Sequence, residues 1–381
     1  MDRQFLMAPG PTPVPEEARL AMARRLIHHR GEAFREVFGE VQEGLAWLFE
    51  TDQPVLSVAA TGTGAFEAAM INFTSRGDTI VCVGGGKFGR RWADVGRAYD
   101  MEVVEVPVEW GRAVDPDRIE EALNAHPDCA MVTLTASETS TGVLHPFEEI
   151  AEVVRDHGRA LFAVDGITAV GVHRMPMDET PIDILVAGSQ KAFGVPPGLG
   201  FVAASERAWK RAERSDHPRY YLDLRRERRR QRDQQTAFTS AISQTLALQV
   251  VLRMMADEGR EALLARHRVN AEATRAGVRA LGLELLADRP SNAVTAVEPP
   301  DGVAAPRIVD IMREEHGVII AGGQADLSER LFRIGHIGFF DRSDMLNALS
   351  ALELTLQRLG IEVESGAAVS AAQGVYAAHL E

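Results

Sequence analysis

Short apolar runs alternate with amphipathic helical patterns from Val55 to about residue 205. Seven of these runs predict strands, at residues 54–59, 79–83, 102–108, 129–135, 160–165, 183–187 and 199–204. Between several of them lie helical patterns, at residues 64–75, 89–99, 115–125 and 147–157. Such apolar strands, separated by helices, are typical of parallel sheets that are covered on both faces. The pattern therefore predicts an α/β fold with a mostly parallel seven-stranded sheet.

The pattern changes after about residue 205. Two long helical stretches, 241–257 and 259–281, follow without a strand between them. A smaller mixed unit then comprises strand 292–298, helix 305–315, strand 317–320, strand 331–334 and helix 342–359. We predict an N-terminal arm over residues 1–20, a large domain over 21–260 and a smaller C-terminal α+β domain over 261–381. The Ala-rich tail from Gly366 fits either a short helix or a frayed end.

Proline, glycine and capping residues mark several boundaries. The segment Pro9-Gly10-Pro11-Thr12-Pro13-Val14-Pro15 predicts a rigid, extended arm, because proline is excluded from helix interiors and central strands. Helical periodicity follows through residues 16–50. Asp115-Pro116 and Pro146 predict helix starts, and Gly158 predicts a helix end.

Composition narrows the class of protein. A net charge of −14 argues against nucleic-acid binding by the chain as a whole. The basic run from Arg225 to Arg232 fits a solvated helix face or a subunit contact, with a phosphate-binding patch as the alternative. No apolar run approaches the ~20 residues of a membrane helix, and the N-terminus lacks the apolar region of a secretory signal. Because Cys82 and Cys129 give no disulfide framework, we expect a cytoplasmic protein without membrane or nucleic-acid partners.

Candidate chemistry lies at the predicted carboxyl ends of the strands, where parallel sheets bind ligands. The turn Thr61-Gly62-Thr63-Gly64-Ala65 opens a helix, so its N–H groups suit an anion such as a single phosphate. Phe88 lies among glycines after the next strand and is placed to stack on a flat ligand. A plain tight turn and a flexible loop are the structural alternatives for these two segments.

Three further strand ends carry polar residues. The hydroxyl-rich turn Ser137-Glu138-Thr139-Ser140-Thr141-Gly142 has a helix-capping turn as its structural alternative. Asp165 ends an apolar strand, where an unpaired carboxylate is costly to bury, and its alternative is a backbone cap. Lys191 follows another strand among small residues, and the chain has only two other lysines, Lys87 and Lys210.

These residues together match the needs of pyridoxal 5'-phosphate. This cofactor needs a lysine amine for its aldehyde and a carboxylate that keeps its pyridine nitrogen protonated. It also needs an anion cradle and a flat side chain over its ring. Lys191, Asp165, the turn from Gly62 to Ala65 and Phe88 supply these in turn. Thr139 is placed to hydrogen-bond the phenolic oxygen, and Lys191 is the natural acid and base for the proton shift.

The chain resembles the class V aminotransferases of the fold-type I pyridoxal-phosphate superfamily, in the alanine/serine–glyoxylate (serine–pyruvate) aminotransferase group. The resemblance spans almost the whole chain and rests on segments that occur in the same order: Pro9-Gly10-Pro11-Thr12-Pro13, Thr61-Gly62-Thr63-Gly64, Phe88-Gly89-Arg90-Arg91-Trp92, Glu138-Thr139-Ser140-Thr141-Gly142-Val143, Val164-Asp165, Gly188-Ser189-Gln190-Lys191 and Phe332-Arg333-Ile334-Gly335-His336.

The resemblance implies roles for the residues that bind the cofactor. Lys191 is implied as the Schiff-base lysine, Asp165 as the pyridinium partner and Phe88 as the stacking ring. Gln190 and the turn of Gly62, Thr63, Gly64 and Ala65 are implied to hold the phosphate.

The resemblance also implies a homodimer with active sites at the subunit interface. Thr236 and Thr239 are implied as further cofactor-binding residues, since Thr239 resembles one that reaches a neighbouring subunit's phosphate. Arg333 is implied to hold the substrate α-carboxylate through two parallel hydrogen bonds. His29 resembles part of a loop near the substrate, and a solvated loop is its alternative. No metal ligand is implied.

The implied reaction is ping-pong transfer of an amino group from alanine or serine to glyoxylate or pyruvate. Two departures concern substrate preference: Ser137 replaces the usual His or Asn, and Ser240 follows Thr239 where Pro is usual. Acidic or phosphorylated donors (aspartate, phosphoserine, 2-aminoethylphosphonate) remain alternatives, as does a non-catalytic cofactor-binding subunit. A cysteine desulfurase is disfavoured because both cysteines lie in apolar runs. A nicotinamide dehydrogenase is disfavoured because the third fingerprint glycine is missing.

Overall fold

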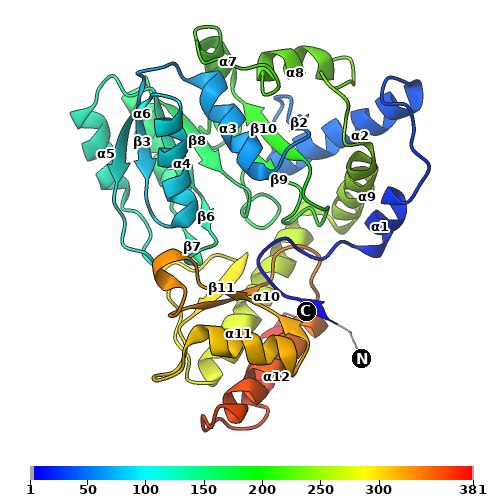
Figure 1. Ribbon diagram of the computed structural model, residues 1–381, viewed down its shortest axis with the longest axis vertical. Coiled ribbons are helices and arrows are strands. Elements are labelled where there is room, and N and C mark those ends of the chain that lie inside the picture. Colours follow the sequence, from blue (N-terminus) through cyan, green and yellow to red (C-terminus); the bar gives the residue numbers. More distant parts are fainter. Residues whose placement is uncertain (1–3, 380–381) are drawn as a thin grey trace.

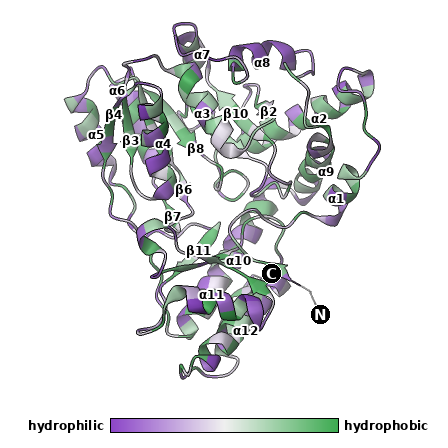
Figure 2. Cartoon of the chain, viewed as in Figure 1, coloured by the Kyte–Doolittle hydropathy of each residue, from purple (hydrophilic) through white to green (hydrophobic). Residues whose placement is uncertain are grey.

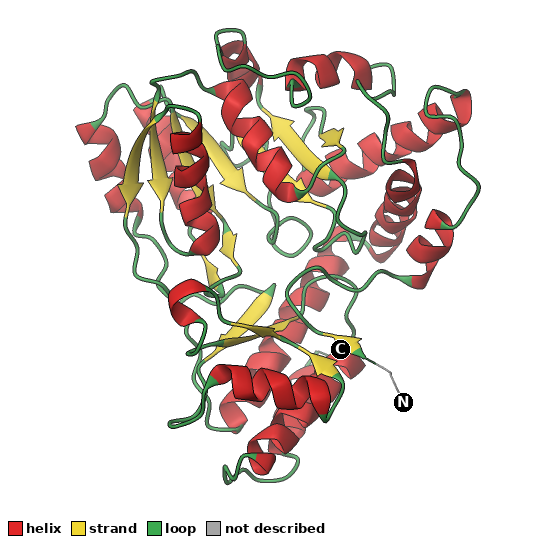
Figure 3. Ribbon diagram, in the orientation of Figure 1, coloured by secondary structure: helices red, strands yellow, loops and turns green. Residues whose placement is uncertain are grey.

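A computed structural model describes residues 4–379, which form a larger and a smaller α/β part (Figures 1 and 3). The first three residues of the predicted arm and the last two of the predicted small domain lie outside the described residues. Within the described range, no helix is long and apolar enough to cross a membrane.

The larger part is built on a sheet of seven strands. They are β2 (Leu56–Val58), β3 (Thr79–Val83), β4 (Glu102–Val106), β5 (Met131–Thr135), β8 (Leu161–Asp165), β9 (Ile184–Gly188) and β10 (Gly200–Ala204). Their order across the sheet is β2-β10-β9-β8-β5-β3-β4. Only β10 runs antiparallel to its neighbours in this sheet. The predicted mostly parallel α/β sheet is confirmed.

Two helical layers cover the two faces of this sheet. One layer contains α1 (Glu16–Met22), α2 (Glu32–Phe49), α5 (Pro116–Ala125), α6 (Phe147–His157) and α9 (Ile242–Glu258). The other contains α3 (Gly62–Phe73), α4 (Lys87–Ala98), α7 (Glu206–Ala212) and the start of α8 (Leu224–Gln231). Successive strand residues point to opposite faces: Val81 packs in the first core, whereas Ile80 and Cys82 pack in the second. Figure 2 shows the resulting hydrophobic strands and the hydrophilic surface of α8.

The predicted helix boundaries have clear local causes. Asp115 caps α5 by accepting a hydrogen bond from the Asp117 N–H at 3.1 Å. Gly158 ends α6 with a φ of +79°, a conformation that glycine adopts without steric cost. Both predictions are confirmed.

The predicted helical stretch over residues 16–50 is wrong in its middle, because residues 23–31 form a loop between α1 and α2. Leu26 in this loop is 68% exposed, so the apolar spacing here does not reflect a helix face buried against a core. The loop instead directs Arg30 to the carbonyl oxygen of Thr236, at 2.5 Å.

The smaller part surrounds a three-stranded antiparallel sheet in the order β11-β14-β13. Its elements are α10 (Arg260–Ala280), β11 (Val294–Val297), α11 (Ala305–Glu314), β12 (Val318–Ile319), β13 (Ala321–Gly322), a 3-10 turn (Ala325–Leu327), β14 (Phe332–Gly335), α12 (Arg342–Arg358) and α13 (Ala367–Ala377). The tail is thus helical, with Ala368 and Ala372 of α13 buried in this core.

The first residues of the N-terminal arm join the smaller part, whereas α1 at its end packs on the larger part. Its strand β1 (Phe5–Leu6) pairs in parallel with β12, and Met7 is buried in the same core. The predicted boundary near residue 260 falls at the junction of α9 and α10. We propose that the chain divides into an arm (1–20), a large domain (21–260) and a small domain (261–381).

Candidate active site

Lys191 lies in the loop that connects β9 to β10. Its Nζ donates a hydrogen bond to the carbonyl oxygen of Pro9 at 2.7 Å, and the Thr12 hydroxyl donates to the carbonyl oxygen of Lys191 at 2.8 Å. A Cβ on Gly10, whose φ is +136°, would lie 2.3 Å from the Lys191 Nζ. The proline-rich arm therefore packs directly on the lysine, a contact that the sequence did not reveal.

The surroundings of Lys191 favour its neutral amine. Burial and then the positive charge of Arg333 lower the pKa of Lys191 to about 8, although the Asp165 carboxylate opposes this shift. With this pKa, roughly a tenth of the lysine is neutral at pH 7, far more than for an ordinary lysine, and this fraction can act as a nucleophile or a proton acceptor.

Asp165 is the last residue of β8 and is buried. Its Oδ1 accepts a hydrogen bond from the Ile167 N–H at 2.8 Å. Burial raises the pKa of Asp165 to about 7, while the charges of Arg91 and Lys191 act in the opposite direction. The neighbouring groups offset little of the cost of burying the charged carboxylate. A cationic partner beside Asp165 would therefore stabilise its charged form.

A cavity of about 330 Å³ brings several of the predicted site residues together. Six of them line it: Thr63, Phe88, Thr139, Asp165, Gln190 and Lys191. Its wall also includes Gly10, Pro11, Thr61, Arg91, Thr135, Ile167, Thr168 and Pro197. The buried oxygens Thr135 Oγ1 and Gln190 Oε1 have no hydrogen-bond partner within residues 4–379. Unpartnered buried oxygens at a cavity are what a polar ligand would satisfy.

The first turn of α3 is open to an anion. Gly62, Thr63, Gly64 and Ala65 form this turn, with no side-chain cap and no acidic residue among the described residues. The first N–H groups of a helix have no partner within the helix, and they favour negative charge. A Cβ on Gly188 would lie 3.1 Å from the Gly62 nitrogen, so the turn is packed against the end of β9.

Phe88 is held in place by a buried carboxylate. Glu138 lies in a hairpin of β6 (Ser137–Glu138) and β7 (Val143–Leu144). Its Oε2 accepts hydrogen bonds from the N–H groups of Phe88 at 3.0 Å and Gly89 at 2.9 Å, at the start of α4. Burial raises the pKa of Glu138, and these hydrogen bonds oppose that shift. Sequence reasoning missed this role, although a carboxylate within a hydroxyl-rich turn was a usable signal.

Arg333 reaches the site from β14 and is only 4% exposed. Its Nη1 donates to the carbonyl oxygen of Thr139 at 2.8 Å, and its Nε and Nη2 donate to the carbonyl oxygen of Gly322 at 2.9 and 2.8 Å. Burial lowers the pKa of Arg333 to about 10. The guanidinium is thus held beside a cavity residue, Thr139, while it does not itself line the cavity wall.

His29, Thr236 and Thr239 lie away from this cavity within the single chain. Thr239 is exposed, and it lines a small hollow together with Thr236 and Phe38. Arg30, next to His29, holds the Thr236 segment through the carbonyl contact described above. A second subunit would be needed to bring these residues to a cofactor.

The two cysteines are unsuited to catalysis. Cys82 lies in β3, whereas Cys129 precedes β5 rather than lying within it. Burial raises the pKa of Cys82 to about 12 and that of Cys129 to about 11, so both thiols stay protonated. No group of three or more His, Cys, Asp and Glu side chains within residues 4–379 is arranged to hold a metal ion.

Comparison with known proteins gives one family and several named relatives. The family model Aminotransferase class-V matches residues 17–334. The soluble hydrogenase 42 kDa subunit of Anabaena cylindrica is 43% identical over 98% of this chain and 99% of its own. The L-aspartate–glyoxylate aminotransferase of Paracoccus denitrificans is 34% identical over 97% of this chain and 96% of its own. The crystal structure of ureidoglycine–glyoxylate aminotransferase from Bacillus subtilis has a TM-score of 0.92 at 29% identity and covers 98% of both chains.

Proposed function

Because this chain belongs to the class-V aminotransferases, which depend on pyridoxal phosphate, we propose that it transfers amino groups from small amino acids to 2-oxo acids by a ping-pong route. The observation that carries the proposal is the shared cavity of Lys191 and Asp165. An aminotransferase needs an amine and a buried carboxylate in one pocket, and a simple binding module has no use for both.

The cavity residues fit the cofactor. The uncapped first turn of α3 suits its phosphate, and the unpartnered oxygens of Thr135 and Gln190 suit its polar groups. When bound, pyridoxal phosphate supplies an electron sink for the carbanion formed at the substrate α-carbon. The remaining chemistry falls to the side chains of the protein.

Lys191 and Asp165 divide the proton work between them. Lys191 would hold the cofactor through its neutral amine, and the same amine would carry the proton to and from the substrate α-carbon. Asp165 holds a proton on the pyridine nitrogen, and this cationic partner would offset the cost of its burial.

Four further groups orient the cofactor. Phe88, fixed by Glu138, stacks on the ring, and Thr139 donates a hydrogen bond to the phenolic oxygen. Gln190 and the turn from Gly62 to Ala65 hold the phosphate. Each of these roles rests on the position of the residue in the cavity wall or in the first turn of α3.

Arg333 would bind the α-carboxylate of either substrate. Its guanidinium is already oriented by the carbonyl oxygens of Thr139 and Gly322, so little side-chain entropy is lost on binding. A planar guanidinium donates two parallel hydrogen bonds to a carboxylate, which fixes the α-carbon relative to Lys191. His29 lies away from the cavity within one chain, so we propose that it contributes to this site from the second subunit.

The active unit is proposed to be a homodimer in which Thr236 and Thr239 of one subunit complete the site of the other. An exposed aromatic patch beside these residues supports it: Tyr220 is 73% exposed, Tyr221 is 47% exposed, and both rings contact Phe238. Exposed aromatic side chains that gather in one place are typical of protein interfaces.

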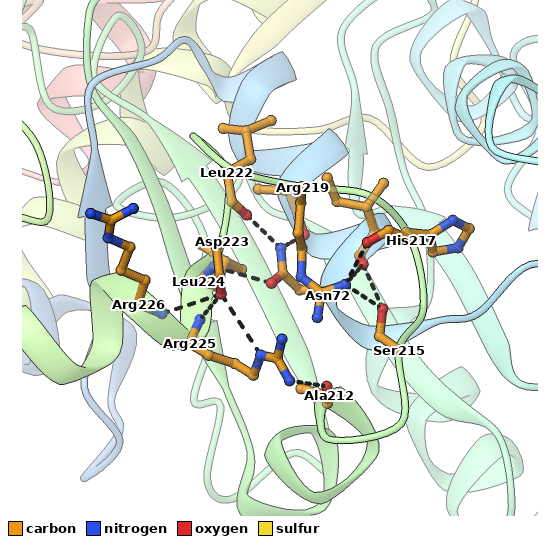
Figure 4. Close-up of polar contacts among 12 residues, drawn as sticks. Asn72, Ala212, Ser215, His217, Arg219, Leu222, Asp223, Leu224, Arg225 and Arg226 are labelled. Atoms are coloured by element: carbon orange, nitrogen blue, oxygen red, sulfur yellow. Dashed lines mark hydrogen bonds and ion pairs between the residues drawn. The ribbon is translucent and has the colours of Figure 1, made fainter.

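The segment that carries Tyr220 and Tyr221 is anchored on both sides by hydrogen bonds that Figure 4 shows. Asn72 of α3 donates to the carbonyl oxygen of Leu222 at 2.7 Å and accepts from the Leu224 N–H at 3.0 Å. Arg219 donates to the carbonyl oxygen of His217 at 3.0 Å, and Asp223 caps α8. A held segment of this kind can dock without a large ordering cost.

For the substrates, we propose glyoxylate or pyruvate as acceptor and alanine or serine as donor. Glyoxylate appears in the names of the relatives from Paracoccus denitrificans and Bacillus subtilis. Aspartate is the alternative donor, because the Paracoccus denitrificans relative is named for it. A non-catalytic subunit is the alternative suggested by the name of the Anabaena cylindrica relative.

A half-reaction assay tests this proposal. The loaded protein is mixed with alanine, serine or aspartate without an acceptor, and the absorbance change is compared with the 2-oxo acid released. We expect one 2-oxo acid per active site, followed by full recovery of the spectrum on addition of glyoxylate. A protein that binds the cofactor but converts none of a wide panel of donors would support the non-catalytic alternative.

A further inference from the structure

Arg91, the fifth residue of α4, reaches into the cavity beside the first turn of α3. Its Nη1 donates a hydrogen bond to the Thr63 hydroxyl at 2.8 Å. Its guanidinium carbon lies 4.9 Å from the centre of the Phe88 ring. The side chain therefore touches two parts of the proposed cofactor site at once, the phosphate turn and the stacking ring.

The charge of Arg91 is not neutralised by the protein. No carboxylate within residues 4–379 lies within 4.0 Å of it, although its neighbour Arg90 pairs with Asp326 at 3.9 Å. Arg91 is half-buried, and Arg90 is exposed. A half-buried guanidinium without a carboxylate, in the wall of a cavity, points to an anionic ligand.

The field of Arg91 extends across the cavity. Burial dominates the raised pKa of Asp165 and the lowered pKa of Lys191, and in both cases the Arg91 charge acts toward a lower pKa. The same cation would therefore attract any anion that enters this cavity.

Two kinds of anion are expected there, the cofactor phosphate and the substrate carboxylates. Thr63, the hydrogen-bond partner of Arg91, is the second residue of α3 and belongs to the phosphate turn. Arg333, the proposed carboxylate anchor, instead contacts Thr139. The partner of Arg91 thus favours the phosphate over a carboxylate.

We propose that Arg91 binds the phosphate of the cofactor, so that a side-chain cation completes the anion site at the start of α3. This inference rests on the proposed function and adds a residue to it. An arginine suits a phosphate because its fork of N–H donors matches the phosphate oxygens. The phosphate would then be held by backbone N–H groups, by Gln190 and by a full positive charge.

The test separates phosphate binding from ring stacking. Cofactor-free wild type, Arg91→Gln and Arg91→Lys are titrated with pyridoxal phosphate and with pyridoxal, which has the same ring and aldehyde but no phosphate. Arg90→Gln serves as the matched control, because it removes the adjacent arginine of the same helix. Dissociation constants are read from the change in tryptophan fluorescence.

We expect Arg91→Gln to weaken pyridoxal phosphate binding roughly 10- to 100-fold, as loss of a charged hydrogen bond predicts. Pyridoxal binding should change less than about threefold, which also shows that the variant is folded. Arg91→Lys should keep most of the affinity, and Arg90→Gln should behave as wild type.

Equal losses for both ligands would overturn the inference, since they would assign Arg91 to the Phe88 ring. Unchanged binding of pyridoxal phosphate to Arg91→Gln would overturn it as well, while leaving the proposed function intact. A wild type that binds neither ligand would overturn the proposed function together with this inference.

Discussion

At the scale of single residues, the site is defined by two groups with opposite pKa shifts. The pKa of Lys191 falls to about 8 and that of Asp165 rises to about 7, chiefly because both are buried. Each shift disfavours the charged form of its group. The neutral amine of Lys191 suits the aldehyde of the cofactor, and the carboxyl of Asp165 suits its ring nitrogen. The cofactor-free protein should therefore be destabilised by Asp165 near neutral pH.

The Asp165→Asn variant of the cofactor-free protein should be more stable than wild type at pH 8. The folded state holds the Asp165 proton more tightly than the unfolded state, so wild-type stability falls as pH rises from about 4 to about 7. The variant escapes this loss, which has an upper limit of about 4 kcal/mol above pH 7. Thermal unfolding of both proteins at about pH 4.5 and about pH 8, near the two ends of that window, measures the difference. A variant that gains nothing between the two pH values would contradict the burial argument.

Replacing Arg333 by Lys should impair substrate use and spare cofactor binding. Lysine cannot donate two parallel hydrogen bonds from a planar group, so kcat/KM for the amino donor should fall roughly 10- to 100-fold. Arg330→Lys, at an exposed position three residues earlier in the chain and outside β14, is the control. Steady-state kinetics measure the loss of substrate use, and cofactor titration measures whether cofactor binding is unchanged. An equal loss of cofactor affinity would assign Arg333 to another role.

At the scale of elements, the sequence predicted most strands and helices because their apolar pattern follows from burial on both sheet faces. Asp165 and Lys191 could be placed at strand ends for the same reason. The contact of Pro9 with Lys191 could not, because it spans 182 positions and depends on tertiary packing. The sequence did not predict the break at residues 23–31, because the helical spacing of apolar residues continues there although these residues do not pack in the core.

Glu138→Gln should loosen the start of α4. The carboxylate accepts the N–H groups of Phe88 and Gly89, and its other oxygen accepts the Ser140 N–H at 3.0 Å. An amide has one acceptor oxygen, so at least one buried N–H loses its partner and the free energy of unfolding should fall by about 1–3 kcal/mol. Denaturant unfolding measures this, with the exposed Glu120→Gln as control. Equal stability of both variants would show that the cap is dispensable.

At the scale of the whole molecule, the proposed site requires two copies of the chain. The cavity of one chain lacks Thr236 and Thr239, which line a hollow with Phe238, and the exposed ring of Tyr220 contacts Phe238. The arm joins the smaller part while contacting Lys191, so both parts of a subunit also meet at the site.

The protein should therefore sediment at twice the monomer mass, and Tyr220→Glu should shift it toward monomer by placing a charge in the interface. Cofactor affinity should fall together with dimer content. Analytical ultracentrifugation over a range of concentrations provides the measurement. A wild-type monomer with full activity would contradict the shared site.

The central claim is that Lys191 carries the cofactor, and covalent trapping tests it most directly. The loaded protein is reduced with borohydride, which fixes a lysine–cofactor link, and its peptides are mapped by mass spectrometry. The chain offers only Lys87, Lys191 and Lys210. We expect the cofactor on Lys191 alone and no trapped cofactor in Lys191→Ala. Cofactor found on Lys87 or Lys210, or on no lysine, would contradict it.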